Sequence, residues 1–221
     1  PRTEAEVKAN IIAYYAMITH LDEQVGRILK TLEEKGLADN TIVVYSADNG
    51  LAVGQHGLMG KQNLYEHSIK VPLIFRGPGI AANKQIEALT YLQDLYSTFC
   101  DFSNIKTPET VEGRSLKSVL LGGEISNRES MFFAYKNFQR AARNNRWKII
   151  KYNVAGEVRT QLFDLKNDPF ETKNLANDMR FSEQLATMEL LLKEQMIMYN
   201  DEADFEEEGW GVPVFLAWKD K

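Results

Sequence analysis

The sequence predicts an α/β fold, in which helices accompany a mostly parallel sheet, followed by a small antiparallel subdomain. Three patterns carry this prediction: a long stretch with helical spacing of apolar residues, short β-branched runs that alternate with helical segments, and a change to short strands after Gly122-Gly123. Alternation of strands and helices is typical of layered α/β architectures. Runs of short strands joined by turn residues are typical of antiparallel sheets.

Residues 4–35 are expected to form one long amphipathic helix. Apolar side chains recur every three or four residues, which places them on one helix face. Gly36 is a helix-ending residue in the expected place. The apolar stripe consists of Val7, Ile11, Tyr14, Ile18, Leu21, Val25, Ile28 and Leu32.

The sheet of the first part is expected to take its strands from short apolar runs. Residues 41–47 read Thr-Ile-Val-Val-Tyr-Ser-Ala, and a continuous β-branched run suits a strand buried on both faces. Residues 70–76 give a second strand, closed by Gly77-Pro78-Gly79. A third strand is expected at 85–90 and a helix at 92–102.

The chain is expected to divide near residue 125. Residues 1–125 form the α/β part, and residues 126–221 form a sheet-plus-helix subdomain. Four antiparallel strands are predicted in this subdomain, at 131–135, 139–143, 147–152 and 160–165. A second amphipathic helix follows through Leu185, Met188, Leu192, Gln195 and Tyr199. The acidic run from Asp201 to Glu208 is interpreted as a solvated tail.

Composition excludes several classes of function. The net charge of −5 and the pI of about 5.4 do not favour a nucleic-acid partner. The single cysteine, Cys100, rules out an intrachain disulfide. No apolar run reaches the length that a membrane-spanning helix requires, so no membrane partner is expected.

The segment from Ser46 to Lys61 carries the residues with chemistry. Asp48 and Asn49 directly follow the first predicted strand, and ligands of open α/β sheets collect at the carboxyl ends of strands. A carboxylate beside an amide oxygen suits a hard cation such as calcium. The alternative is structural, because Asp-Asn-Gly is also a favourable turn sequence.

The continuation of this segment favours the functional interpretation. Gly54, Gly57 and Gly60 leave the backbone free to bend around His56 and Lys61. A cation and an ammonium neutralise the non-bridging oxygens of a tetrahedral anionic ester, and an imidazole can hydrogen-bond or protonate the departing oxygen. Each residue alone is ordinary. The combination indicates a site for such an ester.

Several segments of the chain resemble the type I sulfatases, which belong to the alkaline-phosphatase-like superfamily. The resemblance extends over residues 4–200 and is carried by segments in the same order as in the family. They are Tyr14–Gly26, Ser46-Ala-Asp-Asn-Gly, Gly-Gln-His-Gly-Leu-Met-Gly-Lys ending at Lys61, Leu64-Tyr-Glu-His, Val71–Gly79, Arg143–Ile150 and Leu162–Leu175. The resemblance implies an alkaline-phosphatase-like α/β fold and hydrolysis of sulfate esters.

The resemblance also implies roles for individual residues. Asp48 and Asn49 match calcium ligands of the family, so calcium is the expected cofactor. Lys61 matches the lysine that contacts the sulfate. His56 matches a histidine near the sulfate or the leaving group. His67 is either a substrate-binding residue or a packed one.

The sequence departs from the family in one important respect. The family's nucleophile is a formylglycine made within a Cys/Ser-x-Pro/Ala-x-Arg motif, and these 221 residues contain no such motif. The acidic pair that completes the family's calcium site is also missing. We therefore expect the chain alone to be an inactive sulfatase fragment with an incomplete calcium site. We also expect it to self-associate through an exposed sheet edge.

Other functions stay open at this level. The substrate is expected to be a small sulfate ester or a sulfated glycan, and the family's members are periplasmic, secreted or lysosomal. One alternative is a phosphate or phosphonate monoester hydrolase of the same superfamily. Another is a non-catalytic module that binds anionic glycans through a group of neighbouring side chains, Arg140, Arg143, Arg146, Lys148 and Trp147.

Overall fold

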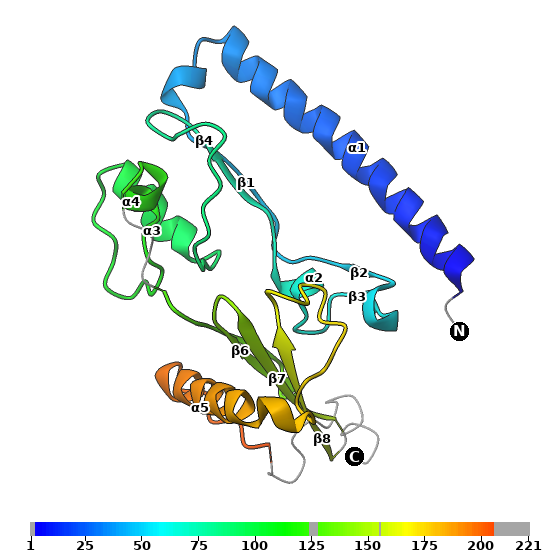
Figure 1. Ribbon diagram of the computed structural model, residues 1–221. Coiled ribbons are helices and arrows are strands. Elements are labelled where there is room, and N and C mark those ends of the chain that lie inside the picture. Colours follow the sequence, from blue (N-terminus) through cyan, green and yellow to red (C-terminus); the bar gives the residue numbers. More distant parts are fainter. Residues whose placement is uncertain (1–2, 124–127, 155, 206–221) are drawn as a thin grey trace, which may run out of the picture. The chain divides into compact units, whose positions relative to one another are not determined.

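The computed structural model describes residues 3–123, 128–154 and 156–205 (Figure 1). The chain divides into two compact units, Pro1–Lys61 with Lys70–Ser126 and Gln62–Ile69 with Asn127–Lys221. The sequence interpretation placed residues 62–69 in the first part, whereas they belong to the second unit. The predicted domain boundary near residue 125 otherwise stays a prediction.

The first unit begins with a 31-residue helix, α1 (Glu4–Glu34). The Thr3 hydroxyl accepts a hydrogen bond from the Glu6 backbone amide, and the Glu6 carboxylate accepts one from the Thr3 backbone amide. This reciprocal pair is a capping box. Gly36 follows the helix with a φ of 66°, the left-handed conformation that glycine adopts easily. The predicted helix is therefore confirmed. None of its residues is buried within the described chain.

The sheet of the first unit differs from the expectation. A short 3₁₀ turn η1 (Ala38–Asn40) leads into β1 (Val43–Ser46), which pairs antiparallel with β4 (Leu73–Arg76). The predicted parallel pairing and full burial of β1 are wrong among the described residues. With β4 as its neighbour there, β1 is half-buried and its Tyr45 is 38% exposed. Residues 85–90 form no strand.

The rest of the first unit supplies a hairpin and a small core. Strands β2 (Ala52–Val53) and β3 (Met59–Gly60) pair antiparallel around η2 (Gln55–Gly57). Helices α3 (Asp94–Phe102) and α4 (Lys117–Leu120) follow β4. The buried side chains of α4 and its preceding residue pack against β4 and α3, in a cluster of Leu116, Val119, Leu120, Leu73, Phe75, Ile86 and Phe102.

The second unit is built around a four-stranded antiparallel sheet, and both faces of this sheet are covered. Its strands are β5 (Met131–Tyr135), β6 (Gln139–Arg143), β7 (Trp147–Val154) and β8 (Glu157–Asp164), paired in chain order (Figure 1). The turn η3 (Met179–Phe181) leads into α5 (Ser182–Met198), and α2 (Glu66–Ile69) is a single turn. The predicted strands and second helix are confirmed.

Adjacent residues of each strand pack on opposite faces of the sheet, because successive side chains of a strand point to opposite sides. Ala142, Ile149 and Leu162 pack with Met188 and Leu192 of α5. Their neighbours Ala141, Ile150 and Phe163 pack on the other face with Leu64, which directly precedes Tyr65 and α2. The sheet therefore fixes α5 on one face and the segment 62–69 on the other.

The acidic run, interpreted from the sequence as a solvated tail, is solvated only in part among its described residues: Glu202 and Asp204 are exposed, whereas Asp201 is half-buried. Asp201 forms two hydrogen bonds with the largely buried Arg140, at 2.5 Å and 3.2 Å. The Asn153 side chain donates to the Phe205 carbonyl at 2.9 Å, and Phe205 is 8% exposed. Glu206, Glu207 and Glu208 lie outside the described residues. Among the described helices, none is long and apolar enough to cross a membrane.

Candidate functional site

The hairpin of β2 and β3 returns the chain to the residues that follow β1. Ala52 pairs with Gly60, so the next residue along, Lys61, lies opposite the residue that precedes Ala52. Asp48 and Asn49 are only a few residues further back. A local fold therefore brings together three of the predicted site residues.

The ammonium group of Lys61 points at the oxygens of the acid–amide pair. Its Nζ donates to Asn49 Oδ1 at 2.8 Å and lies 3.9 Å from Asp48 Oδ2. The backbone N–H of Asn49 donates a hydrogen bond to the other carboxylate oxygen, Asp48 Oδ1, at 2.9 Å. The side chain of Asp48 is 85% exposed and that of Lys61 is 49% exposed. The Asp48 and Lys61 side chains are therefore exposed, next to the half-buried Asn49.

Glycines at two points make this return of the chain feasible. Gly54 has a φ of 105°, and a Cβ there would come within 2.7 Å of the Val7 side chain on α1. Gly60 has a φ of 121°. A side chain at either position is strained, so the spacing noted in the sequence reflects a real backbone requirement.

His56 lies on the exposed turn η2, between β2 and β3. Its φ of 53° is uncommon for a residue with a side chain, and such strain is often found at functional positions. Its assignment to the sulfate or the leaving group stays a prediction.

His67 lies on α2 and therefore belongs to the second unit. Its ring is half-buried and is 5.6 Å from the ring of Tyr65, measured between centroids. Both alternatives from the sequence, substrate contact and packing, are compatible with a half-buried ring. Its role stays a prediction.

The acid–amide pair has the chemistry of a partial calcium site. The Asp48 and Asn49 oxygens both face a cation, the Lys61 ammonium, and oxygen ligands of this kind suit calcium. Within the described ranges, no three His, Cys, Asp or Glu side chains are grouped so that they can hold a metal ion. The pair fits two of the roughly six to eight ligands that calcium usually takes.

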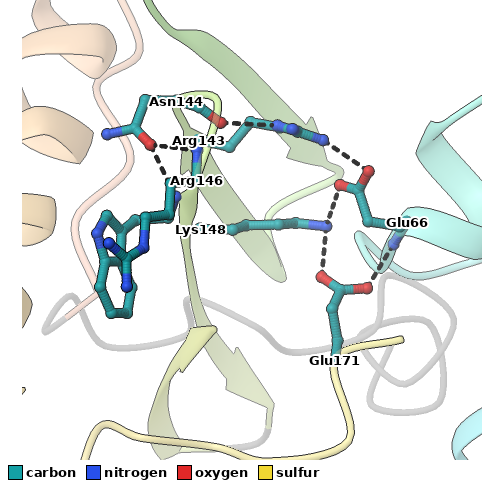
Figure 2. A network of polar contacts seen from close by, with 7 residues as sticks. Glu66, Arg143, Asn144, Arg146, Lys148 and Glu171 are labelled. Carbon is teal, nitrogen blue, oxygen red and sulfur yellow. Dashed lines mark hydrogen bonds and ion pairs between the residues drawn. The ribbon is translucent and has the colours of Figure 1, made fainter. Parts of the chain in front are cut away.

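The basic group that suggested a glycan-binding module is already neutralised by carboxylates. Arg140 pairs with Asp201, and Arg146 pairs with Asp164. Arg143 pairs with Glu66, and Lys148 pairs with both Glu66 and Glu171 (Figure 2). The ring of Trp147 packs against the core that faces α5. These contacts favour a structural role for the group and do not support the binding module.

Sequence reasoning missed two residues of this group, Glu66 and Glu171. They face Lys148 from positions 82 residues before it and 23 residues after it. The only available signal was indirect, since both residues lie in segments that carry the resemblance to sulfatases. Hydrophobic periodicity gives no information about such pairs.

Two family models match the chain. The model described as "N-sulphoglucosamine sulphohydrolase, C-terminal" matches residues 54–198, and the model described as "Sulfatase" matches residues 1–105. Together they span residues 1–198 and so reach into both units. The two matches overlap over residues 54–105, a range that includes His56 and Lys61.

Curated relatives agree with these models. Arylsulfatase K of Bos taurus is 36% identical over 188 residues, which is 79% of this chain and 34% of that protein. N-acetylglucosamine-6-O-sulfatase of Bacteroides thetaiotaomicron is 32% identical over 208 residues, or 88% of this chain and 37% of that protein. The chain thus spans little more than a third of the length of these relatives.

Solved structures share the fold. A structure described as a complex with its substrate D-glucosamine-2-N,6-O-disulfate has a TM-score of 0.81 and 30% identity, covering 88% of this chain and 42% of the other. The phosphonate monoester hydrolase of Agrobacterium radiobacter has a TM-score of 0.76 and 28% identity, covering 87% and 43%. The fold is therefore the α/β fold of the alkaline-phosphatase-like class. Within that class, the chain belongs to the sulfatase family.

Proposed function

We propose that this chain forms part of a sulfatase that hydrolyses sulfate esters on carbohydrates. One observation supports this most: the Lys61 ammonium, the Asp48 carboxylate and the Asn49 amide oxygen meet at one accessible place. A fixed positive charge beside oxygen ligands is suited to the non-bridging oxygens of a tetrahedral ester.

In this proposal the residues of the chain act on different parts of the ester. Lys61 donates hydrogen bonds to a non-bridging sulfate oxygen and stabilises the negative charge that builds up there. His56 hydrogen-bonds to the leaving oxygen or donates a proton to it as the S–O bond breaks. His67 contacts the part of the substrate that carries the sulfate.

Asp48 and Asn49 would hold a calcium ion in the complete site. When bound, the ion supplies positive charge beside the sulfate oxygens. Because two ligands are too few for tight binding, we propose that the 221-residue chain binds calcium only weakly. A calorimetric titration that gave tight binding by this chain would contradict this part of the proposal.

The nucleophile is proposed to come from outside these residues. The chain belongs to a family whose nucleophile is a formylglycine, and its own sequence contains no Cys/Ser-x-Pro/Ala-x-Arg motif. We therefore propose that the 221 residues alone turn over no sulfate ester. Activity is expected in a polypeptide that also provides the motif.

The substrate class is proposed from two relatives. One is named N-acetylglucosamine-6-O-sulfatase, and one solved neighbour is described with a disulfated glucosamine as its substrate. Both names specify sulfate on an amino sugar. A sulfated glycan is therefore the preferred substrate in this proposal.

The phosphonate monoester hydrolase among the structural neighbours supports a second candidate. The same charges stabilise phosphoryl and sulfuryl oxygens, so geometry alone does not separate the two. The test uses a polypeptide that carries these residues together with the nucleophile motif. It compares kcat/KM for a sulfated glucosamine, and for an aryl sulfate and an aryl phosphonate monoester that share one leaving group. We expect a sulfate ester to be preferred. Preference for the phosphonate would replace the sulfatase proposal with the second candidate.

We also propose that the isolated chain self-associates. The apolar stripe of helix α1 includes exposed side chains, among them Ile18 at 43%, Leu21 at 48% and Ile28 at 63% exposure, and exposed apolar surface of this kind favours association. Sedimentation velocity is expected to show oligomers that dissociate when Leu21 and Ile28 are both replaced by lysine. Self-association would be contradicted if the chain stayed monomeric at about 100 µM, which is well within the concentration range where aggregation-prone surfaces associate.

A further inference from the structure

Four charged side chains meet inside the second unit, and we refer to them as the buried charge cluster: Glu66, Arg143, Lys148 and Glu171 (Figure 2). Glu66 comes from the start of α2, Arg143 and Lys148 from β6 and β7, and Glu171 from the loop after β8. The side chain of Lys148 is fully buried and that of Glu171 is 1% exposed. A buried group of charges requires close pairing to be tolerated.

Glu66 is at the centre of the cluster and is held at three points. Its Oε1 accepts from Lys148 Nζ at 3.0 Å and its Oε2 accepts from Arg143 Nη1 at 2.6 Å. Its backbone amide donates to Glu171 Oε2 at 2.6 Å. Contacts to both the side chain and the backbone fix the position and the direction of the chain at residue 66.

The charges of the cluster balance. Arg143 and Lys148 are directly opposite each other on paired strands, an arrangement that repels when no anion intervenes. Glu66 contacts both, and Glu171 contacts Lys148 at 2.7 Å. Two cations thus meet two carboxylates. Removing Lys148 leaves the Glu171 carboxylate buried without its cation.

The surroundings affect the two carboxyl groups differently. Burial alone would raise the pKa of Glu66, but the charges of Lys148 and Arg143 and their hydrogen bonds hold it below its ordinary value. Burial raises the pKa of Glu171, because Lys148 and the Glu66 amide offset it only in part. Glu66 is therefore the more firmly charged anion of the cluster.

Glu171 is brought to the cluster by an ordered loop. Its φ of 57° is left-handed, a conformation that is strained for a residue with a side chain. The carboxylate of Asp168 accepts from the Thr172 hydroxyl at 3.0 Å and from the Lys173 amide at 2.8 Å. These bonds stabilise the loop in the one shape that turns Glu171 toward the Glu66 amide.

The residues on either side of Glu66 determine what its position controls. His67 follows it directly, and the His67 ring lies beside the ring of Tyr65. The Tyr65 hydroxyl donates to Gln161 on β8 at 3.0 Å, and its ring packs edge-on against Phe163. The chain is thus anchored to the sheet at residue 65 through an aromatic side chain and at residue 66 through the buried charge cluster.

We propose that the buried charge cluster is a positioning device for His67. It holds α2 against the sheet so that the imidazole is presented in one orientation to the substrate, which makes Glu66, Lys148 and Glu171 positioning residues. This inference rests on the proposed function in assigning a substrate contact to His67. The contacts that hold residue 66 are independent of that assignment.

The test uses Glu171→Gln, because glutamine keeps the shape of the side chain and an acceptor for the Glu66 amide but removes the charge that faces Lys148. The matched control is Glu157→Gln, which removes an exposed carboxylate from the same unit. The chain has three histidines, so the imidazole signals can be assigned one by one by NMR. Glu171 is 104 residues from His67 in sequence, so a change at His67 must pass through the fold.

We expect Glu171→Gln to move the imidazole signals of His67 and to leave those of His20 and His56 in place. In the active protein it is expected to raise KM for a sulfate ester about tenfold with a smaller change in kcat, because misplaced contacts weaken substrate binding. The control is expected to change neither quantity. Circular dichroism establishes that each variant is folded, and Lys148→Met repeats the test if Glu171→Gln does not fold.

Two results separate the inference from the proposed function. Unchanged His67 signals in a folded variant would overturn the positioning role, whatever the activity. Absence of sulfate-ester turnover by a polypeptide that carries these residues together with the nucleophile motif would overturn the proposed function, and the NMR comparison would still decide whether the cluster orients His67.

Discussion

Replacement of Lys61 by alanine, in a polypeptide that also carries the nucleophile motif, is expected to lower kcat/KM for a sulfate ester by about 10²- to 10³-fold, the effect of removing one preorganised group that stabilises transition-state charge. The physical reason is the position of the ammonium, 2.8 Å from Asn49 Oδ1 and 3.9 Å from Asp48 Oδ2. At this place it can neutralise the same oxygens of the ester that a cation held by the pair would face. Initial rates at several substrate concentrations measure the loss.

The stability of this variant is expected to stay within about 0.5 kcal/mol of the wild type, because exposed side chains contribute little to folding. Lys84→Ala is the control, since Lys84 is an exposed lysine of the same unit. Should Lys61→Ala retain more than half of the wild-type kcat/KM, the role assigned to Lys61 would be wrong.

Replacement of Lys148 by methionine is expected to lower the free energy of unfolding by about 3–5 kcal/mol, the usual effect of breaking a buried ion pair from one side. Methionine fills a similar volume, so the loss reports the Glu171 carboxylate that is left without its cation, rather than a cavity. Urea denaturation followed by circular dichroism measures the change.

A second substitution tests the cause of this loss. Adding Glu171→Gln to Lys148→Met restores the charge balance, because Arg143 then faces Glu66 alone, and at least about 1 kcal/mol of the lost stability is expected to return. Arg159→Met, at an exposed ion pair with Glu157, is expected to change stability by less than about 1 kcal/mol. A loss below about 1 kcal/mol for Lys148→Met would show that the cluster does not stabilise the unit.

Local patterns in the sequence predicted most of the elements. The spacing of apolar residues predicted α1, because an amphipathic helix of 31 residues repeats its signal many times. The strands of the second unit followed from short alternating runs with turn residues between them. There, pairs such as Ala141 and Ala142 occupy opposite faces of one sheet, so a local period matches the packing.

Pairing between distant residues could not be predicted in the same way. The β-branched run at residues 41–47 suggested a strand buried on both faces, yet burial and strand direction depend on neighbours that no local pattern specifies. The hairpin of β2 and β3 has two residues in each strand, too few for periodicity to register. The contacts of Lys148 likewise join segments far apart in the chain.

The candidate site was predictable where residue chemistry and resemblance agreed. Asp48, Asn49 and Lys61 were selected from the sequence, and the structure places these three together. The roles proposed for them, calcium binding and sulfate contact, stay predictions. His56 was selected from its place among the glycines and from the resemblance, and His67 from the resemblance alone. A single imidazole on a turn or a short helix carries little information about its task.

A double-mutant cycle on Asp48 and Lys61 tests the central claim, that the acid–amide pair and the ammonium act on the same ester. In a polypeptide that also carries the nucleophile motif, the cycle compares kcat/KM of the unchanged protein with the values for Asp48→Asn, for Lys61→Ala and for both changes. If the groups act together, the double variant should lose much less than the product of the two single losses, as for catalytic residues that work as a unit. Losses that multiply, equivalent to free energies that add within about 0.5 kcal/mol, would contradict the account.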